Sequence, residues 1–149
     1  QTQQTQHFRN MLRHKVIISP RLLSLRVDEN LFFANAVHLQ RFIEERMNDR
    51  AMLQHVVLNC VSVSQIDYSA LDVLEALNKK LSDAGIGFHL SELKGPVEDR
   101  LSSNDFLAHL NGHVFLHHYQ AVSALDAVVY PPLYFTSATI EDIEAGSHI

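Results

Sequence analysis

The chain has 149 residues, of which 46% are hydrophobic and 19% are charged, and its formal net charge is −5 at pH 7. This size and composition fit one globular domain with a hydrophobic core. The acidic balance argues against a nucleic-acid partner, which would require clustered Lys and Arg, and no apolar run is as long as a membrane-spanning helix needs.

The first third of the chain indicates short strands separated by turns. Residues 1–6 are polar and aperiodic, which favours a linker or a disordered segment. The apolar, β-branched run at 15–19 predicts a strand, and the partly alternating run at 22–27 predicts a second one, paired with the first as a hairpin. A turn is expected at 28–30, followed by a third, short strand at 31–33.

A helix is expected next, with Asn35 as its N-cap. Residues 55–61 then form an apolar run with the length and β-branching of a buried strand, and the lone Cys60 within it is most simply a small hydrophobe. After this run the apolar period changes to that of a helix ending at Gly85, with a leucine stripe formed by Leu71, Leu74, Leu77 and Leu81.

The polar turn between that strand and that helix is Asp67-Tyr68-Ser69. Either Asp67 or Ser69 could serve as the helix cap, since both are capping residue types. A turn in which a buried strand leads into a helix leaves backbone N–H groups pointing outward, so the turn is a candidate site for an anion or a partner protein.

The second half continues the alternation of strands and helices. A buried strand is expected at 86–90, a helix that begins with Gly-Pro at 95–99, and a further helical turn at 106–110. A short edge strand at 114–116 and a terminal helix at 121–129 complete the pattern. The strand–helix–strand succession predicts parallel pairing.

Together these elements predict a single α/β domain over residues 15–130, followed by a tail at 131–149. We expect a mixed sheet of about four to six strands with helices mainly on one face.

Three stretches of the sequence carry a family resemblance. Asp67-Tyr68-Ser69-Ala70-Leu71 resembles the Asp-Ser-Ser-Gly-Leu turn of STAS domains, a module found in anti-sigma-factor antagonists and sulfate transporters. Residues 29–36, which include Phe-Phe-Ala-Asn-Ala, resemble a segment typical of STAS domains in SulP-type anion transporters. Residues 7–14 resemble the segment that joins such a domain to its membrane part, and the likeness extends to about Val129.

This resemblance implies a non-catalytic, regulatory domain on the cytoplasmic side of the membrane, belonging to a sulfate or other anion transporter of the SulP type. Its expected partners are the membrane domain of the same transporter and other cytoplasmic proteins. Residues 1–14 would then be the linker that follows the membrane domain, and its basic residues would either contact lipid headgroups or simply be solvated: Arg9, Arg13, His14 and the adjacent Lys15.

Within the turn, Ser69 matches the serine that is phosphorylated in the antagonists, and Asp67 matches the acid before it. Tyr68 and Ala70 depart from the antagonist pattern and make the turn bulkier. The alternative function is therefore a free-standing phosphoswitch of the anti-sigma-factor-antagonist type that binds a kinase-like partner. A reading frame with hydrophobic spans upstream of Gln1 would favour the transporter, and a start codon just before His7 would favour the switch.

Phe32 and Phe33 form a candidate docking patch for the membrane domain. In a regular strand successive side chains point to opposite faces, so we expect one ring to be buried and the other to lie near the surface.

Other chemistry has little support in the sequence. His113, His117 and His118 come closest to metal-ligand spacing, but no Cys or acid cluster accompanies them, and no metal is expected. His38, His55 and His89 are interpreted as helix-surface or strand-edge residues. No catalytic residue and no cofactor are expected; nucleotide binding is implied only weakly, by the family, since the chain has no Gly-rich phosphate loop.

Overall fold

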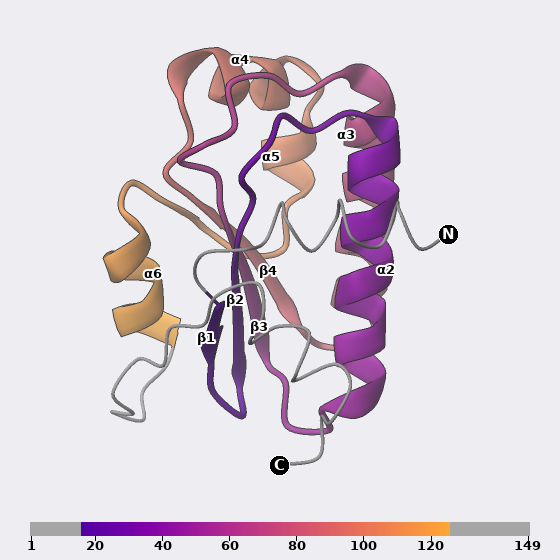
Figure 1. The fold of residues 1–149 in the computed structure, drawn as a ribbon, viewed down its shortest axis with the longest axis vertical. Helices are drawn as coiled ribbons and strands as arrows, with labels where there is room; N and C mark the ends of the chain where they lie inside the picture. The colour runs from indigo at the N-terminus through magenta and orange to yellow at the C-terminus, as the bar shows by residue number, and fades with distance from the viewer. Residues whose placement is uncertain (1–15, 126–149) are drawn as a thin grey trace.

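The computed structural model describes residues 16–125, which form a five-stranded mixed sheet with the strand order β1-β2-β3-β4-β5 (Figure 1). β1 (Val16–Ile18) and β2 (Leu22–Arg26) form the expected antiparallel hairpin. β3 (His55–Asn59), β4 (Gly87–Ser91) and β5 (Val114–Phe115) continue the sheet from β2 in parallel. The predicted α/β class and parallel core are therefore confirmed.

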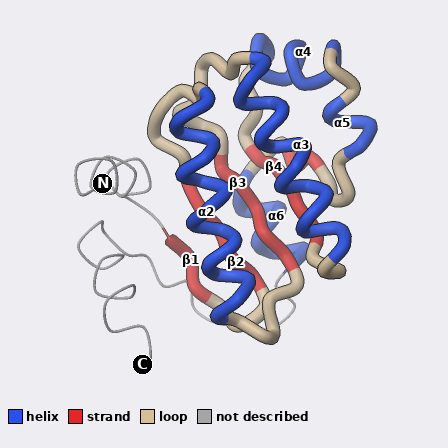
Figure 2. Tube along the Cα trace, turned by 90° about the vertical axis from the view of Figure 1, so that its right-hand side faces the viewer, coloured by secondary structure: helices blue, strands red, loops and turns tan. Residues whose placement is uncertain are grey.

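The helices lie mainly on one face of the sheet, as expected. α2 (Phe33–Asp49) and α3 (Tyr68–Asp83) cover this face side by side, as Figure 2 shows. α4 (Gly95–Ser103) and α5 (Phe106–His109) follow β4, and α5 packs against α3. Of the helices within residues 16–125, α6 (His118–Leu125) is the one that covers the opposite face. Among residues 16–125, none of the helices has the length and hydrophobicity needed to cross a membrane.

The leucine stripe of α3 faces the sheet, as its spacing predicts. Leu71, Leu74, Leu77 and Leu81 are all buried in the main core, which lies between α2, α3 and the sheet. The helix ends at Asp83 with Ala84 as its C-cap, and Gly85 follows with a φ of +74°, in the left-handed region that favours glycine.

The two faces of the sheet differ in chemistry. Side chains that point toward α2 and α3 are apolar, and they include Leu23, Leu25, Val56, Leu58, Phe88 and Leu90. Side chains one residue away on each strand point toward α6 and include polar groups: Ser24, His55, His89 and Ser91. A buried sheet with one apolar and one partly polar face was not expected from the sequence.

The start of α2 corrects two expectations. The helix begins at Phe33 with Phe32 as its N-cap residue, so Asn35 is not the cap. Instead, the Asn35 side chain donates to the carbonyl oxygen of Asn30 at 2.8 Å and lies within the first helical turn. The expected strand at 31–33 reduces to one isolated parallel bridge between Leu31 and Ile66, because the chain turns into the helix immediately.

The end of the described chain differs in its boundaries. The short edge strand is confirmed at Val114–Phe115, and α6 begins at His118, three residues before the expected start at 121. The expected end of this helix at 129, the linker at 1–14 and the tail at 131–149 lie outside the described residues.

Candidate functional site

The Asp67 turn is built around one carboxylate oxygen. Asp67 is the N-cap of α3, and its Oδ1 accepts a hydrogen bond from the backbone N–H of Ala70 at 2.8 Å. The same Oδ1 accepts a second hydrogen bond from the hydroxyl of Ser69 at 3.1 Å. Of the two candidate caps, Asp67 therefore fulfils the role, and Ser69 is left on the surface with its hydroxyl turned toward the cap.

The turn is open to solvent. Ser69 is exposed, and Tyr68 is 58% exposed. The guanidinium carbon of Arg100 on α4 lies 4.5 Å from the centre of the Tyr68 ring, which is a cation–π distance. Tyr68 is thus contacted by a neighbouring element and still exposes most of its side chain to solvent.

Both phenylalanines of the candidate docking patch are exposed, Phe32 by 44% and Phe33 by 55%. The expectation that one of them would be buried is wrong. It assumed the alternation of a strand, whereas these residues are the N-cap and the first position of α2. At a helix start, two successive side chains can both point away from the core.

Asn30 joins the loop before α2 to the loop before α3. Its Oδ1 accepts hydrogen bonds from the backbone N–H groups of Ser64 at 2.8 Å and Gln65 at 3.0 Å. Two backbone hydrogen bonds complete the junction: Leu31 donates to Gln65 at 3.0 Å, and Asp67 donates to Leu31 at 3.1 Å. The Phe32–Phe33 pair and the Asp67 turn therefore share one hydrogen-bonded support.

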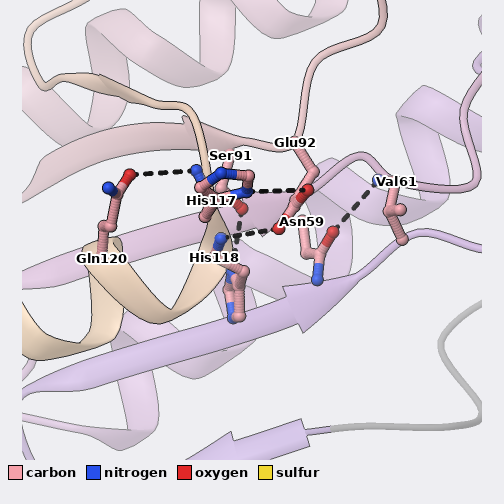
Figure 3. A network of polar contacts seen from close by, with 7 residues as sticks. All are labelled: Asn59, Val61, Ser91, Glu92, His117, His118 and Gln120. Atoms are coloured by element: carbon pink, nitrogen blue, oxygen red, sulfur yellow. Dashed lines mark hydrogen bonds and ion pairs between the residues drawn. The ribbon is translucent and has the colours of Figure 1, made fainter.

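These features form one surface at the carboxyl ends of β2 and β3. Val61, at the carboxyl end of β3, is 42% exposed, and its N–H donates to Oδ1 of Asn59 at 3.0 Å (Figure 3). In sheets with parallel strands, this edge is where ligands and partners usually bind. We call it the carboxyl-edge surface, and it consists of Phe32, Phe33, Val61, Asp67, Tyr68 and Ser69.

A shallow, open hollow of about 610 Å³ adjoins this surface. Among the described residues, its lining includes two acidic side chains and no Lys or Arg, and Nζ of Lys94 reaches its border at 3.4 Å from Oγ of Ser64. The lining itself is therefore poorly suited to a phosphate group. The weak implication of nucleotide binding gains nothing from this chemistry. The lining residues are Asp28, Glu29, Asn30, Phe32, Asn35, Ser62 and Ser64.

A second polar cluster lies on the opposite face of the sheet, under α6. His118 is held between two strands: its Nε2 lies 2.7 Å from Oγ of Ser24, and its Nδ1 lies 2.7 Å from Oγ of Ser91. Its backbone N–H donates to Oε2 of Glu92 at 2.8 Å (Figure 3). Burial lowers the pKa of His118, while the Glu92 carboxylate acts in the opposite direction.

His55 and His89 form a pair on the same face. Nδ1 of His55 lies 3.0 Å from Nε2 of His89, and the backbone N–H of His113 donates to Nδ1 of His89 at 2.9 Å. Since Nδ1 of His89 accepts, Nε2 of the neutral ring carries the proton and donates it to His55. Burial, together with the nearby His55 and His113, lowers the pKa of His89 to about 4.

The interpretation of His89 as a strand-edge residue is therefore wrong, because it is buried on a central strand. The three histidines that the sequence analysis considered as metal ligands contact different residues. His113 contacts His89, His117 lies near Glu92, and His118 contacts Ser24. Within the part of the chain that the structure describes, no group of three His, Cys, Asp or Glu could hold a metal ion. Burial raises the pKa of the Cys60 thiol to about 12, which makes it a poor nucleophile.

Sequence reasoning singled out the Asp67 turn and the phenylalanine pair, but it missed Asn30 and Val61. It considered the histidines under α6 without predicting that they lie together. Asn30 could have been found as an Asx-type turn residue before a helix. The histidine cluster had no comparable signal, because it depends on which strands become neighbours.

Comparison with known proteins identifies the family to which the sequence is similar. The model of the STAS domain matches residues 14–121. Sulfate transporter 3.2 of Arabidopsis thaliana is 28% identical over 139 residues, which cover 86% of this chain and 22% of the transporter. The chain thus spans about a fifth of the length of this relative.

Solved structures of low sequence identity share the fold. A Thermotoga maritima protein assigned as an anti-sigma factor antagonist has a TM-score of 0.66 at 21% identity, covering 80% of this chain and 97% of its own. The STAS domain of a SulP transporter from Vibrio cholerae has a TM-score of 0.59 at 19% identity, covering 86% and 88%. The murine Solute Carrier 26 family member A9 anion transporter has a TM-score of 0.66 at 16% identity, covering 85% and 24%.

The match to the family model includes every strand of the sheet and the whole carboxyl-edge surface. The resemblance first seen in the Asp67 turn and in residues 29–36 is thereby confirmed along most of the sequence. The chain belongs to the STAS domain family.

Proposed function

We propose that this chain is the non-catalytic, regulatory domain of a SulP-type sulfate or other anion transporter, lying on the cytoplasmic side of the membrane. In this function the domain spans residues 15–130, residues 1–14 are the linker from the membrane domain, and residues 131–149 are a tail. The carboxyl-edge surface contacts the membrane domain of the same polypeptide, and it is also available to other proteins.

The direction of β1 is the observation that carries this proposal. Val16, the first residue of β1, pairs with Leu25 near the carboxyl end of β2. The chain therefore reaches the domain at the same edge of the sheet that carries Phe32, Phe33 and Tyr68 (Figure 1). A membrane domain attached before residue 15 would be tethered next to this exposed apolar surface, which raises its effective concentration there.

The chemistry of the carboxyl-edge surface fits a protein partner. It combines three exposed aromatic rings with a hydrogen-bonded polar turn, and aromatic anchors of this kind are enriched in the centres of protein interfaces. Ser69 gives the surface a group that could be phosphorylated, and a phosphate there would place new negative charge at the start of α3.

The test is anion uptake by the intact transporter. Phe33→Ser removes an exposed apolar side chain from the carboxyl-edge surface, and Met52→Ser is its matched control, because Met52 is 62% exposed at the opposite edge, between α2 and β3. We expect Phe33→Ser to lower uptake by about fivefold or more at equal amounts in the membrane, the lower range of coupling between sites. We expect Met52→Ser to leave uptake unchanged. Equal uptake by the two variants would contradict the proposal.

The second candidate is the free-standing phosphoswitch, and the exposed Ser69 beside the Asp67 cap favours it. Its partner would be a kinase-like protein that binds the same turn. The complete reading frame separates the two functions, since a coding region with many hydrophobic spans before Gln1 supports the transporter. A start codon just before His7 would support the switch.

A further inference from the structure

α6 is held on the sheet by a small set of apolar contacts. A separate cluster of buried side chains lies beneath it, apart from the main core on the other face. Its fully buried members are Leu22, Val57 and Ala121, and Phe115, Val122 and Leu125 pack partly against them. Since this cluster is small among the described residues, polar contacts make an important contribution to the attachment of this segment.

These polar contacts are made by histidines. His118 bridges Ser24 on β2 and Ser91 on β4, with both distances 2.7 Å. Just before β5, the backbone N–H of His113 donates to His89. Residues 112–125, which we call the cover, therefore enclose His118 and His89. The N–H of His113 requires Nδ1 of His89 to accept, which only the neutral ring can do.

The close fit around His89 shows how well the pair is sealed. A Cβ placed on Gly112 would lie 2.6 Å from Nδ1 of His89, and one placed on Gly87 would lie 2.6 Å from its Nε2. Only glycine leaves room for the ring at both positions. A protonated His89 would also lose the acceptor for the His113 N–H, because both of its ring nitrogens would then be donors.

Within residues 16–125, few charged side chains near the cover could compensate for protonation of its histidines. Oε2 of Glu92 accepts a hydrogen bond from the backbone N–H of His118. Oε1 of the same carboxylate lies 3.9 Å from Nδ1 of His117. On β2, Arg26 faces the same side but is paired with Asp28 at 2.6 Å. β3 contributes His55 and Asn59, and His118 is the one acidic or basic residue within the described span of α6.

We propose that the cover is a pH-sensitive element, which opens from the sheet when the pH falls below neutrality because His55, His89 and His118 must then become charged. The main core holds no titrating histidine pair of this kind in the described residues, so α2 and α3 stay in place while the cover opens. This inference does not depend on the proposed function, since it concerns the opposite face of the sheet from α2 and α3.

The expected size of the effect follows from proton linkage. A histidine binds a proton more tightly in the open state, so acid shifts the balance toward opening. His89 has a pKa of about 4 when covered and an ordinary value of 6.5 when exposed, so it alone should increase opening about 30-fold between about pH 7.5 and about pH 5. Lowered pKa values of His55 and His118 add to this in the same direction.

Hydrogen exchange of the 149-residue chain tests the proposal, with a chelator present so that no metal binds the histidines. Amide protection, corrected for the intrinsic pH dependence of exchange, is compared between residues 114–125 and the leucine stripe of α3. We expect protection of residues 114–125 to fall about 30-fold from about pH 7.5 to about pH 5, while that of α3 changes little.

The variant His89→Gln keeps an acceptor and a donor but cannot titrate, so its cover should lose most of the pH dependence. His109→Gln is the matched control, because His109 is exposed on α5 beside Glu75 and away from the cover, and it should behave as the wild type. If His89→Gln does not fold, the ring pKa of His89 is read from the wild type by NMR. A value near 6.5, a cover whose protection is independent of pH, or equal losses in α3 and the cover would each overturn the proposal.

Discussion

The hydroxyl of Ser69 donates to Oδ1 of Asp67 across 3.1 Å, and this same oxygen caps α3 through the N–H of Ala70. The residue that is open to modification is therefore bonded directly to the residue that stabilises the helix start. This arrangement separates two roles that the sequence left open, because Asp67 caps the helix and Ser69 is exposed to solvent.

Loss of the cap should be measurable. Asp67→Ala removes the acceptor for the Ala70 N–H and should lower the free energy of unfolding by about 1 kcal/mol, in the usual range of about 0.5–2 kcal/mol. Asp67→Asn keeps a capping oxygen and should lose much less. Urea unfolding of the two variants and the wild type checks this, and equal stability of Asp67→Ala and the wild type would show that the cap contributes nothing.

A negative charge at position 69 should leave the fold intact. Ser69→Glu places a carboxylate in the first turn of α3, where the helix dipole favours it, while Asp67 opposes it at close range. The two effects should offset each other to within about 1 kcal/mol. Thermal melting of the purified chain should therefore be close to that of the wild type, with the change seen instead in partner binding or transport. A chain that fails to fold would contradict this prediction, because it would show that the start of α3 does not tolerate a second carboxylate beside Asp67.

The main core depends on the leucine stripe of α3. Leu74 is buried between α3 and the sheet, so Leu74→Ala should cost about 2–5 kcal/mol through lost burial and the cavity left behind. Asp72→Ala on the exposed side of the same helix should change stability by less than about 0.5 kcal/mol. Similar melting temperatures for both variants would show that the stripe does not carry the core.

Substitution of Gly112 tests how closely the chain fits around His89, and Gly95 provides a control position. A Cβ on Gly112 would lie 2.2 Å from the carbonyl oxygen of Phe88, whereas a Cβ on Gly95 would meet no atom within 4 Å. Gly112→Ala should therefore destabilise the chain by about 1–3 kcal/mol, because the backbone of β4 cannot move aside easily. Gly95→Ala is the control and should be neutral. Chemical denaturation measures both, and a neutral Gly112→Ala would mean that the loop before β5 is free to shift.

The sequence predicted the fold well because its strongest signals are local. The β-branched run before Cys60 and the four leucines of α3 each define an element and its buried side without knowledge of the rest of the chain. The parallel pairing of the strands could be predicted because strands and helices alternate along the sequence. Predictions at junctions were weaker: the cap at Asn35 was wrong because the bond that holds Asn35 goes to the Asn30 carbonyl in the preceding turn.

The side-chain clusters also differ in how far the sequence predicts them. Asp67, Tyr68 and Ser69 are neighbours in sequence, so their turn could be identified from the chain itself. The junction of Asn30 with Ser64, and the clamp of His118 on Ser24 and Ser91, join residues far apart in sequence. Such contacts depend on strand order and register, which a single sequence does not specify residue by residue.

The most direct test of the proposed docking to the membrane domain is photo-cross-linking in the full-length polypeptide. A photoreactive amino acid at Phe33 places the reactive group on the carboxyl-edge surface, and the same residue at Met52 serves as the control on the opposite edge. We expect the probe at position 33 to join this domain to a membrane-spanning part of the same protein, and the probe at position 52 to give no such product. Cross-links from position 52 and none from position 33 would contradict the proposed orientation, and no cross-link to the membrane domain from either position would contradict the docking itself.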